Sequence, residues 1–214
     1  MTRVYLLRHG ETSWNADGNR YCGRTDLPLS VDGRKQARAA SHALAAVPLE
    51  AIYVSPLIRS RETGELVSDA ISLPITTDPR LIEIDFGAWE GLTADEIAVA
   101  DPSGRADWLN DPTLARAGGT GETGQEVSQR LQGLFHEIAA THSRSSIAVI
   151  GHNTANRLYL AASLGAPLAS YRRIALENAS ISIFELESGE ARWLRINDVS
   201  HLRNQPTKRV LQTE

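Results

Sequence analysis

RVYLLRHGET, residues 3–12, joins a short apolar run directly to a group of charged side chains. The apolar part, Arg3–Leu7, is rich in strand-forming residues and predicts a buried strand. Two later apolar runs, Ala51–Val54 and Ser146–Ile150, end in the same way, just before Ser55-Pro56 and Gly151-His152. The sequence thus places its most reactive side chains where predicted strands end.

Helical patterns alternate with these strands. Helices are expected over about 31–46, with Ser30 as N-cap, over 55–70, with Ser55 as cap, from Thr93, over 122–140 and over 153–164. A third short strand is expected at 74–77, and segments 180–186 and 191–196 read as a hairpin. This order predicts an α/β fold, a three-layer α/β/α sandwich with a mainly parallel sheet and one C-terminal antiparallel hairpin.

The chain reads as a single domain over residues 1–204, with a small helical cap insertion at about 84–124 and a polar tail at 205–214. Its 214 residues carry a formal net charge of -4 and include a single cysteine. No run of about 18 apolar residues is present. We therefore expect a cytoplasmic protein that binds neither nucleic acid nor membrane.

Four basic side chains follow the ends of three strands, and together they indicate an anion site. Arg8 and His9 follow the first strand, Arg59 lies in the first turn of the next helix, and His152 follows the strand over 146–150. In open α/β sheets ligands bind beyond the carboxyl ends of the strands. Arginine matches phosphate oxygens, and histidine serves as nucleophile or acid–base group. Asp17, Asp26 and Asp32 are scattered through a loop, so we expect no metal.

Several segments resemble the histidine phosphatase superfamily, which has the phosphoglycerate mutase-like fold. The resemblance covers nearly the whole chain to about residue 204 and favours the phosphatase branch, which includes the α-ribazole and broad-specificity phosphatases. The matching segments are RHGETSWN (8–15), NRYCGRTDLPLS (19–30), SPLIRSRET (55–63), LIEIDFGAWEG (81–91), GET (121–123), IGHN (150–153) and ENASIS (177–182).

The resemblance implies a role for each matching polar residue and no cofactor. His9 attacks phosphorus and becomes phosphohistidine, while Arg8, Arg59 and His152 hold the phosphoryl oxygens. Glu83 protonates the leaving oxygen and later takes a proton from water.

Asn15, the backbone at Cys22 and Gly23, and Asn153 are expected to line the same pocket. Arg61 is the rival for Arg59 and is expected to face solvent. Asp85 and Glu90 are the rivals for Glu83.

The function favoured is hydrolysis of a small phosphate ester. The alternative is a phosphoglycerate mutase-type isomerase, in which the phosphoryl group returns to the substrate; a catalytically dead binding domain is the third possibility. The mutase branch has a longer and more basic segment between the Glu83 and His152 motifs, whereas residues 89–121 here are short and acidic. The cap favours a neutral leaving alcohol. Two questions stay open. One is whether Trp89, Trp108 and Tyr21 contact the leaving alcohol, and the other is whether an exposed hairpin edge supports a homodimer.

Overall fold

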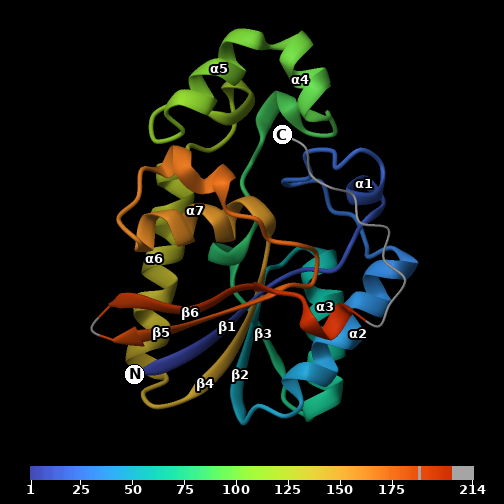
Figure 1. Ribbon diagram of the computed structural model, residues 1–214, viewed down its shortest axis with the longest axis vertical. Helices are drawn as coiled ribbons and strands as arrows, with labels where there is room; N and C mark the ends of the chain where they lie inside the picture. The colour runs from blue at the N-terminus through green and yellow to red at the C-terminus, as the bar shows by residue number, and fades with distance from the viewer. Residues whose placement is uncertain (188, 204–214) are drawn as a thin grey trace.

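The computed structural model describes residues 1–187 and 189–203; the predicted tail at 205–214 lies outside the described residues. One six-stranded sheet with the order β3-β2-β4-β1-β5-β6 forms the centre of the molecule (Figure 1). Strands β1 to β4 run parallel, and β5 and β6 are antiparallel, as the sequence predicts. The strands are β1 (Thr2–Arg8), β2 (Leu49–Val54), β3 (Ile75–Thr77), β4 (Ser146–Gly151), β5 (Ile181–Glu187) and β6 (Glu190–Asp198).

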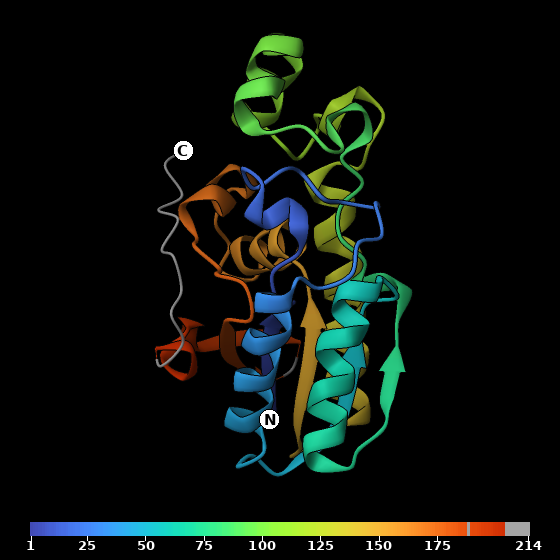
Figure 2. The same cartoon turned by 90° about the vertical axis from the view of Figure 1, so that its right-hand side faces the viewer.

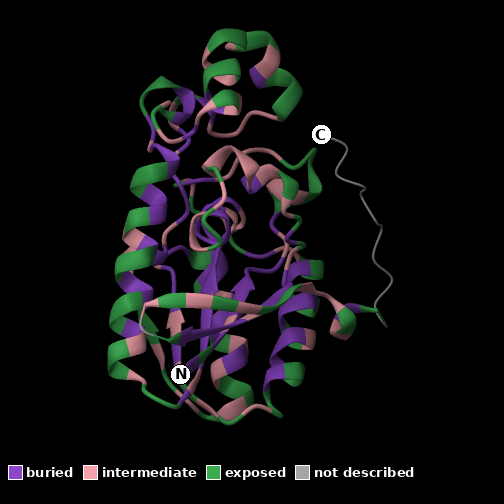
Figure 3. Ribbon diagram, turned by 60° about the vertical axis from the view of Figure 1, so that its left-hand side comes forward, coloured by how far each residue is buried: buried purple, intermediate pink, exposed green. Residues whose placement is uncertain are grey.

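Helices cover both faces of the sheet and confirm the three-layer sandwich. Side chains of a strand alternate between its two faces, so β1 contributes Val4 and Leu6 to one core and Leu7 to the other. Buried residues concentrate in the sheet and on the helix sides that face it (Figure 3). Helices α2 (Val31–Leu44) and α3 (Ile58–Ile71) stand side by side on one face (Figure 2), and α6 (Gly124–Thr141) and α7 (Asn153–Ser163) cover the other.

Most helix starts agree with the sequence, and one does not. The Ser30 hydroxyl accepts a hydrogen bond from the Gly33 N–H at 2.9 Å, as expected of an N-cap. The predicted start of α3 at Ser55 is wrong, because Leu57 occupies the N-cap position and makes no side-chain cap. The Ser55 hydroxyl instead contacts His152, at 2.7 Å from its Nε2 atom.

The segment between the third strand and α6 projects beyond the sheet as a small helical layer (top of Figure 1). It contains α4 (Ala94–Ala100) and α5 (Pro102–Asn110). The Asp101 carboxylate accepts the Gly104 N–H at 3.0 Å and Pro102 stands at the first helical position, which together explain the helix.

Trp89 and Trp108 pack inside this layer. Their rings meet edge to face at 6.2 Å between centroids, and both side chains are buried. Trp89 donates its indole N–H to Asp101, and Trp108 donates to the Tyr171 hydroxyl. Core packing therefore explains both tryptophans.

The remaining elements are short. None of the helices in the described part of the chain is long and apolar enough to cross a bilayer. The short elements are α1 (Ser13–Ala16), η1 (Pro79–Leu81), η2 (Gly87–Trp89), η3 (Ala117–Gly119), η4 (Leu168–Arg173) and η5 (Ser200–Leu202).

Candidate active site

The parallel pairing of β1 with β4 brings the two predicted histidines together. Arg8 lies opposite Gly151 in the register, so His9 and His152 follow their strands at the same edge of the sheet. Their ring centroids are 5.1 Å apart. His9, His152, Arg8, Arg59 and Glu83 are all buried, with exposures between 0% and 4%.

The His9 ring is held in one tautomer. Its Nδ1 atom lies 2.6 Å from the Gly10 carbonyl oxygen, which only accepts, so Nδ1 carries the proton and Nε2 keeps its lone pair. Burial, followed by the positive charges of Arg59 and Arg8, holds the pKa of His9 well below 6.5. His9 is therefore neutral at pH 7, as a nucleophile must be.

His152 has the opposite arrangement. Its Nε2 contacts the Ser55 hydroxyl, which also accepts the Leu57 N–H at 3.3 Å. When Ser55 donates its proton to Nε2, the ring proton lies on Nδ1, which is buried without a hydrogen-bond partner within the described residues. Burial, then Arg59 and His9, hold the pKa of His152 well below 6.5.

Both arginines are fixed by backbone carbonyls. Arg8 donates to Leu176 at 2.6 Å, and Arg59 donates to Thr25, Cys22 and Gly23 at 2.8 to 3.1 Å. Burial lowers the pKa of Arg8 to about 10, which still leaves it charged at pH 7. Among the described residues, the Nε atoms of both arginines are buried and unpartnered.

Glu83 lies at the first turn of α7. Its carboxylate accepts the N–H groups of Ile84, Thr154 and Ala155 at 2.8 to 3.0 Å. The N–H groups of Thr154 and Ala155 in the first turn of α7 are thus bound to Glu83. Oε2 accepts only one of these bonds, from Thr154, which leaves capacity for a proton.

The predicted pocket-lining residues lie around this centre in supporting positions. Asn15 accepts from the Thr12 N–H at 3.0 Å and from Asn178, which also donates to the His9 carbonyl at 3.2 Å. Cys22 and Gly23 present their carbonyls to Arg59. Asn153 begins α7, and its Oδ1 is buried without a partner in the described chain.

Cys22 lies half-buried near Arg59. Burial raises the pKa of its thiol to about 11, so the thiolate needed for redox reactivity is scarce at pH 7. This agrees with a residue of the pocket wall and disfavours a redox-active thiol.

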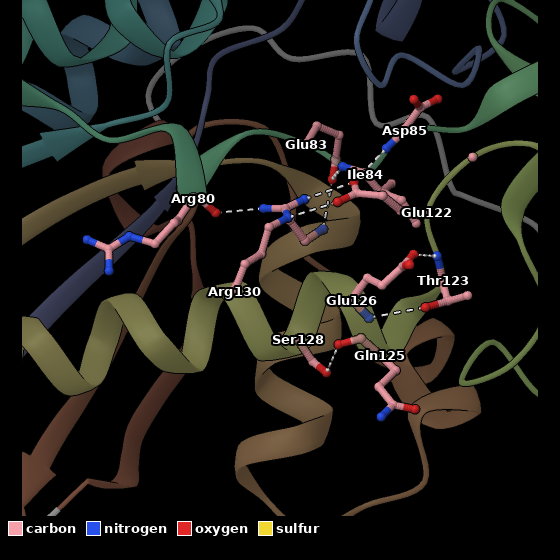
Figure 4. A network of polar contacts seen from close by, with 12 residues as sticks. Arg80, Glu83, Ile84, Asp85, Glu122, Thr123, Gln125, Glu126, Ser128 and Arg130 are labelled. Carbon is pink, nitrogen blue, oxygen red and sulfur yellow. Dashed lines mark hydrogen bonds and ion pairs between the residues drawn. The ribbon is translucent and has the colours of Figure 1, made fainter.

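The rival residues have other partners. Arg61 is exposed and pairs with Glu65 at 3.6 Å, as expected of a solvent-facing side chain. Asp85 caps Gly87. Figure 4 shows the Asp85 N–H directed at Glu122, which Arg130 also binds.

Glu90 has a structural role that the sequence reasoning missed. Its carboxylate accepts three backbone N–H groups, those of Gly23, Arg24 and Thr25, and also the Thr25 hydroxyl. The loop that carries the Arg59 acceptors is therefore fixed from both sides. No local sequence pattern signals this role, because the contact spans more than 60 residues.

Three buried nitrogen atoms at the site, on Arg8, Arg59 and His152, have no hydrogen-bond partner in the part of the chain that the structure describes. Buried donors in proteins normally have acceptors, so such a set suits an anion with several oxygens. In residues 1–187 and 189–203, no three His, Cys, Asp or Glu side chains are grouped so as to hold a metal ion.

Known proteins are similar to this chain over nearly its whole length. The family model of the histidine phosphatase superfamily (branch 1) matches residues 4–199. Phosphoserine phosphatase 1 of Hydrogenobacter thermophilus is 32% identical over 202 residues, covering 94% of this chain and 95% of that protein. The probable phosphoglycerate mutase GpmB of an Enterobacter species is 32% identical over 209 residues, with the same coverage.

A solved structure agrees. YhfR of Bacillus stearothermophilus superimposes with a TM-score of 0.86 at 35% identity, covering 94% of this chain and all of that one. The sequence motifs, the fold and these relatives lead to one conclusion: the chain belongs to the histidine phosphatase superfamily, branch 1.

Proposed function

We propose that the chain hydrolyses a small phosphomonoester without a metal, through a phosphohistidine on His9. The three unpartnered donors on Arg8, Arg59 and His152 carry this proposal, because they match the oxygens of one phosphoryl group. In the first step His9 Nε2 attacks phosphorus and the bond to the leaving oxygen breaks. Glu83 gives its proton to that oxygen, so the alcohol leaves neutral.

The second step regenerates the enzyme. Water attacks the phosphohistidine, the bond between phosphorus and Nε2 breaks, and Glu83 takes the proton of the water. Charge grows on the phosphoryl oxygens in both steps, and Arg8, Arg59 and the His152 N–H stabilise it there. The site therefore needs buried, fixed donors, which the carbonyl contacts of both arginines supply.

Hydrolysis is favoured over the mutase reaction. Relatives of both kinds are equally identical to this chain, so identity does not separate them. The segment 89–121 favours hydrolysis, because it is short and acidic and has only two basic residues, Arg105 and Arg116, fewer than the mutase branch. This segment, within the insertion at about 84–124, is proposed to act as a cap over the leaving group.

The direct test is phosphate release from p-nitrophenyl phosphate in EDTA. We expect release by the wild type and a loss of at least about a thousandfold in His9→Ala, since the nucleophile is removed. His136→Ala, an exposed histidine of α6, is the matched control and should remain active. Release abolished by EDTA, or retained in His9→Ala, would overturn the mechanism.

The setting of the enzyme is also a proposal. A single cysteine supports a cytoplasmic location, and the acidic balance supports a protein that does not bind nucleic acid. β6 forms an edge of the sheet and exposes Leu194 and Ile196, which supports a homodimer. Sedimentation of the wild type beside a Leu194→Lys variant tests it; two identical monomer profiles would contradict it.

A further inference from the structure

Three arginines lie around the aromatic residues at the junction of the cap, α7 and η4. The Arg157 guanidinium lies 5.1 Å from the centroid of the Tyr171 ring, and that of Arg172 lies 5.9 Å from it. Arg157 also donates its Nε–H to the Tyr171 carbonyl at 2.8 Å. Tyr171 thus holds two positive charges from different elements close together.

The cap adds the third charge. Trp108 of α5 donates to the Tyr171 hydroxyl at 2.9 Å, which fixes α5 against η4. Arg105 precedes Trp108 by three residues, so the two side chains are neighbours on the helix surface. Arg105 makes no ion pair within the described residues.

These charges reach the proposed reaction centre. Tyr21 directly precedes Cys22, whose carbonyl binds Arg59. Burial raises the pKa of the Tyr21 hydroxyl, and Arg105, Arg172 and Arg157 all act to lower it. Arg157 also acts on Arg8. Ring contacts connect the two regions, because Tyr21 meets Trp89 at 6.4 Å and Trp89 meets Trp108 at 6.2 Å between centroids.

One of the arginines has an unused buried donor. Arg172 donates its Nη2 to the Leu109 carbonyl at 3.0 Å, whereas its Nη1 is buried and unpartnered among the described residues. A cavity of about 350 Å³ opens beside it, lined by Leu109, Ala169, Ser170, Arg172 and Arg173. A donor of this kind needs an acceptor.

Three acidic residues of the cap have partners of their own. Asp101 accepts from Trp89 and Gly104, Asp111 caps Thr113, and Glu96 caps α4 and pairs with Arg20. These three carboxylates serve helix ends and cap packing. The acidic composition of the cap therefore does not by itself determine the charge of the leaving group.

We propose that Arg105, Arg157 and Arg172 bind an anionic group, a carboxylate or a second phosphate, on the alcohol part of the substrate. This subsite rests on the proposed function, since it recognises the leaving group of the same reaction. Arginine binds either anion through paired N–H groups. The enzyme then selects phosphomonoesters whose leaving alcohol is itself charged.

The test compares substrates that differ by one anionic group. 3-Phosphoglycerate is paired with glycerol 3-phosphate, and glucose 1,6-bisphosphate with glucose 6-phosphate. We expect kcat/KM to favour the anionic member of at least one pair by about tenfold or more. A preference confined to the first pair identifies a carboxylate, and one confined to the second identifies a phosphate. Equal turnover within both pairs would overturn the proposal.

Variants assign the preference to the arginines. Arg105→Gln and Arg172→Gln should each reduce it by about tenfold while turnover of the neutral member changes little. Arg105→Lys keeps the charge and should retain most of the preference. Arg61→Gln, which removes an exposed arginine from α3, is the matched control. An unchanged preference in both Gln variants would contradict this assignment.

Binding keeps the two proposals separable. Calorimetry with His9→Ala should show tighter binding of 3-phosphoglycerate than of glycerol 3-phosphate, or of the bisphosphate than of glucose 6-phosphate, even if no phosphate is released by any protein. Such a result would support the anion subsite and reject the hydrolytic function. Phosphate release that requires His9, without preference in either pair, would reject the subsite and keep the function.

Discussion

The histidine pair shows how single hydrogen bonds assign chemical roles. His9 donates from Nδ1 to a carbonyl, which leaves Nε2 as a nucleophile. The Nε2 atom of His152 contacts the Ser55 hydroxyl, and its Nδ1 atom is buried without a hydrogen-bond partner among the described residues. The same side chain thus becomes a nucleophile in one position and a donor in the other.

Replacing Ser55 should weaken the reaction without removing it. In Ser55→Ala, His152 loses the bond that fixes its tautomer, and we expect kcat to fall about tenfold with a smaller change in KM. Steady-state kinetics across pH should also show a changed profile, because the proton of His152 is no longer fixed.

Ser60→Ala is the control, since its buried hydroxyl bonds the Ile150 carbonyl and does not touch His152. Both variants lose a buried hydrogen bond, which is worth about 1 kcal/mol of stability. Equal kinetic losses in the two variants would show that Ser55 acts only through stability.

The loop 21–25 is the element whose shape the site most depends on. Its carbonyls bind Arg59 from one side, and its N–H groups bind Glu90 from the other. Gly23 permits the close approach, because a Cβ there would lie 2.2 Å from the Glu90 carboxylate and 2.3 Å from the Ile84 carbonyl. The position of the Arg59 side chain therefore depends on the conformation of this loop.

Removing the Glu90 carboxylate should therefore disturb catalysis from a distance. In Glu90→Ala the loop loses its acceptors, Arg59 loses fixed partners, and we expect kcat/KM to fall about tenfold to a hundredfold. Glu96→Ala is the control. Like Glu90, Glu96 accepts a backbone N–H, and it also pairs with the Arg20 side chain, but it belongs to the cap helix α4. Wild-type kinetics in Glu90→Ala would contradict the role given to the loop.

At the scale of the whole molecule, the fold holds two neutral histidines in a buried, positively charged centre. Both have a pKa well below 6.5 in the folded state, because burial and Arg59 disfavour the charged ring. Half-buried His201 shifts in the same direction. In the unfolded chain these rings take a proton near pH 6.5.

Stability should therefore decrease as pH falls from about 7.5 to about 5.5. Below pH 6.5 the unfolded state binds more protons than the folded state, so each buried histidine costs roughly 1 to 1.5 kcal/mol of unfolding free energy by pH 5.5. Urea unfolding in a buffer without phosphate measures it. A His9→Gln variant should show a clearly smaller pH dependence. A wild-type stability that is constant or rises towards pH 5.5 would contradict the neutral pair.

The local sequence was enough to predict the α/β sandwich, the strand ends and the residues Arg8, His9, Arg59 and His152 as candidates, whereas Glu83 came from the family resemblance. Apolar runs, caps and turn residues act within a few positions of each other, so the sequence displays them directly. The family motifs added the proposed roles, which the geometry supports and the experiments above test.

The tertiary structure alone decided how those residues are held. Three sets of hydrogen bonds join segments that lie 65 to 97 residues apart. They connect Ser55 with His152, Glu90 with the loop 21–25, and Glu83 with the first turn of α7. The arginines around Tyr171 likewise come from α5, α7 and η4. No local pattern encodes such contacts, because they depend on how sheet register and helix packing bring distant segments together.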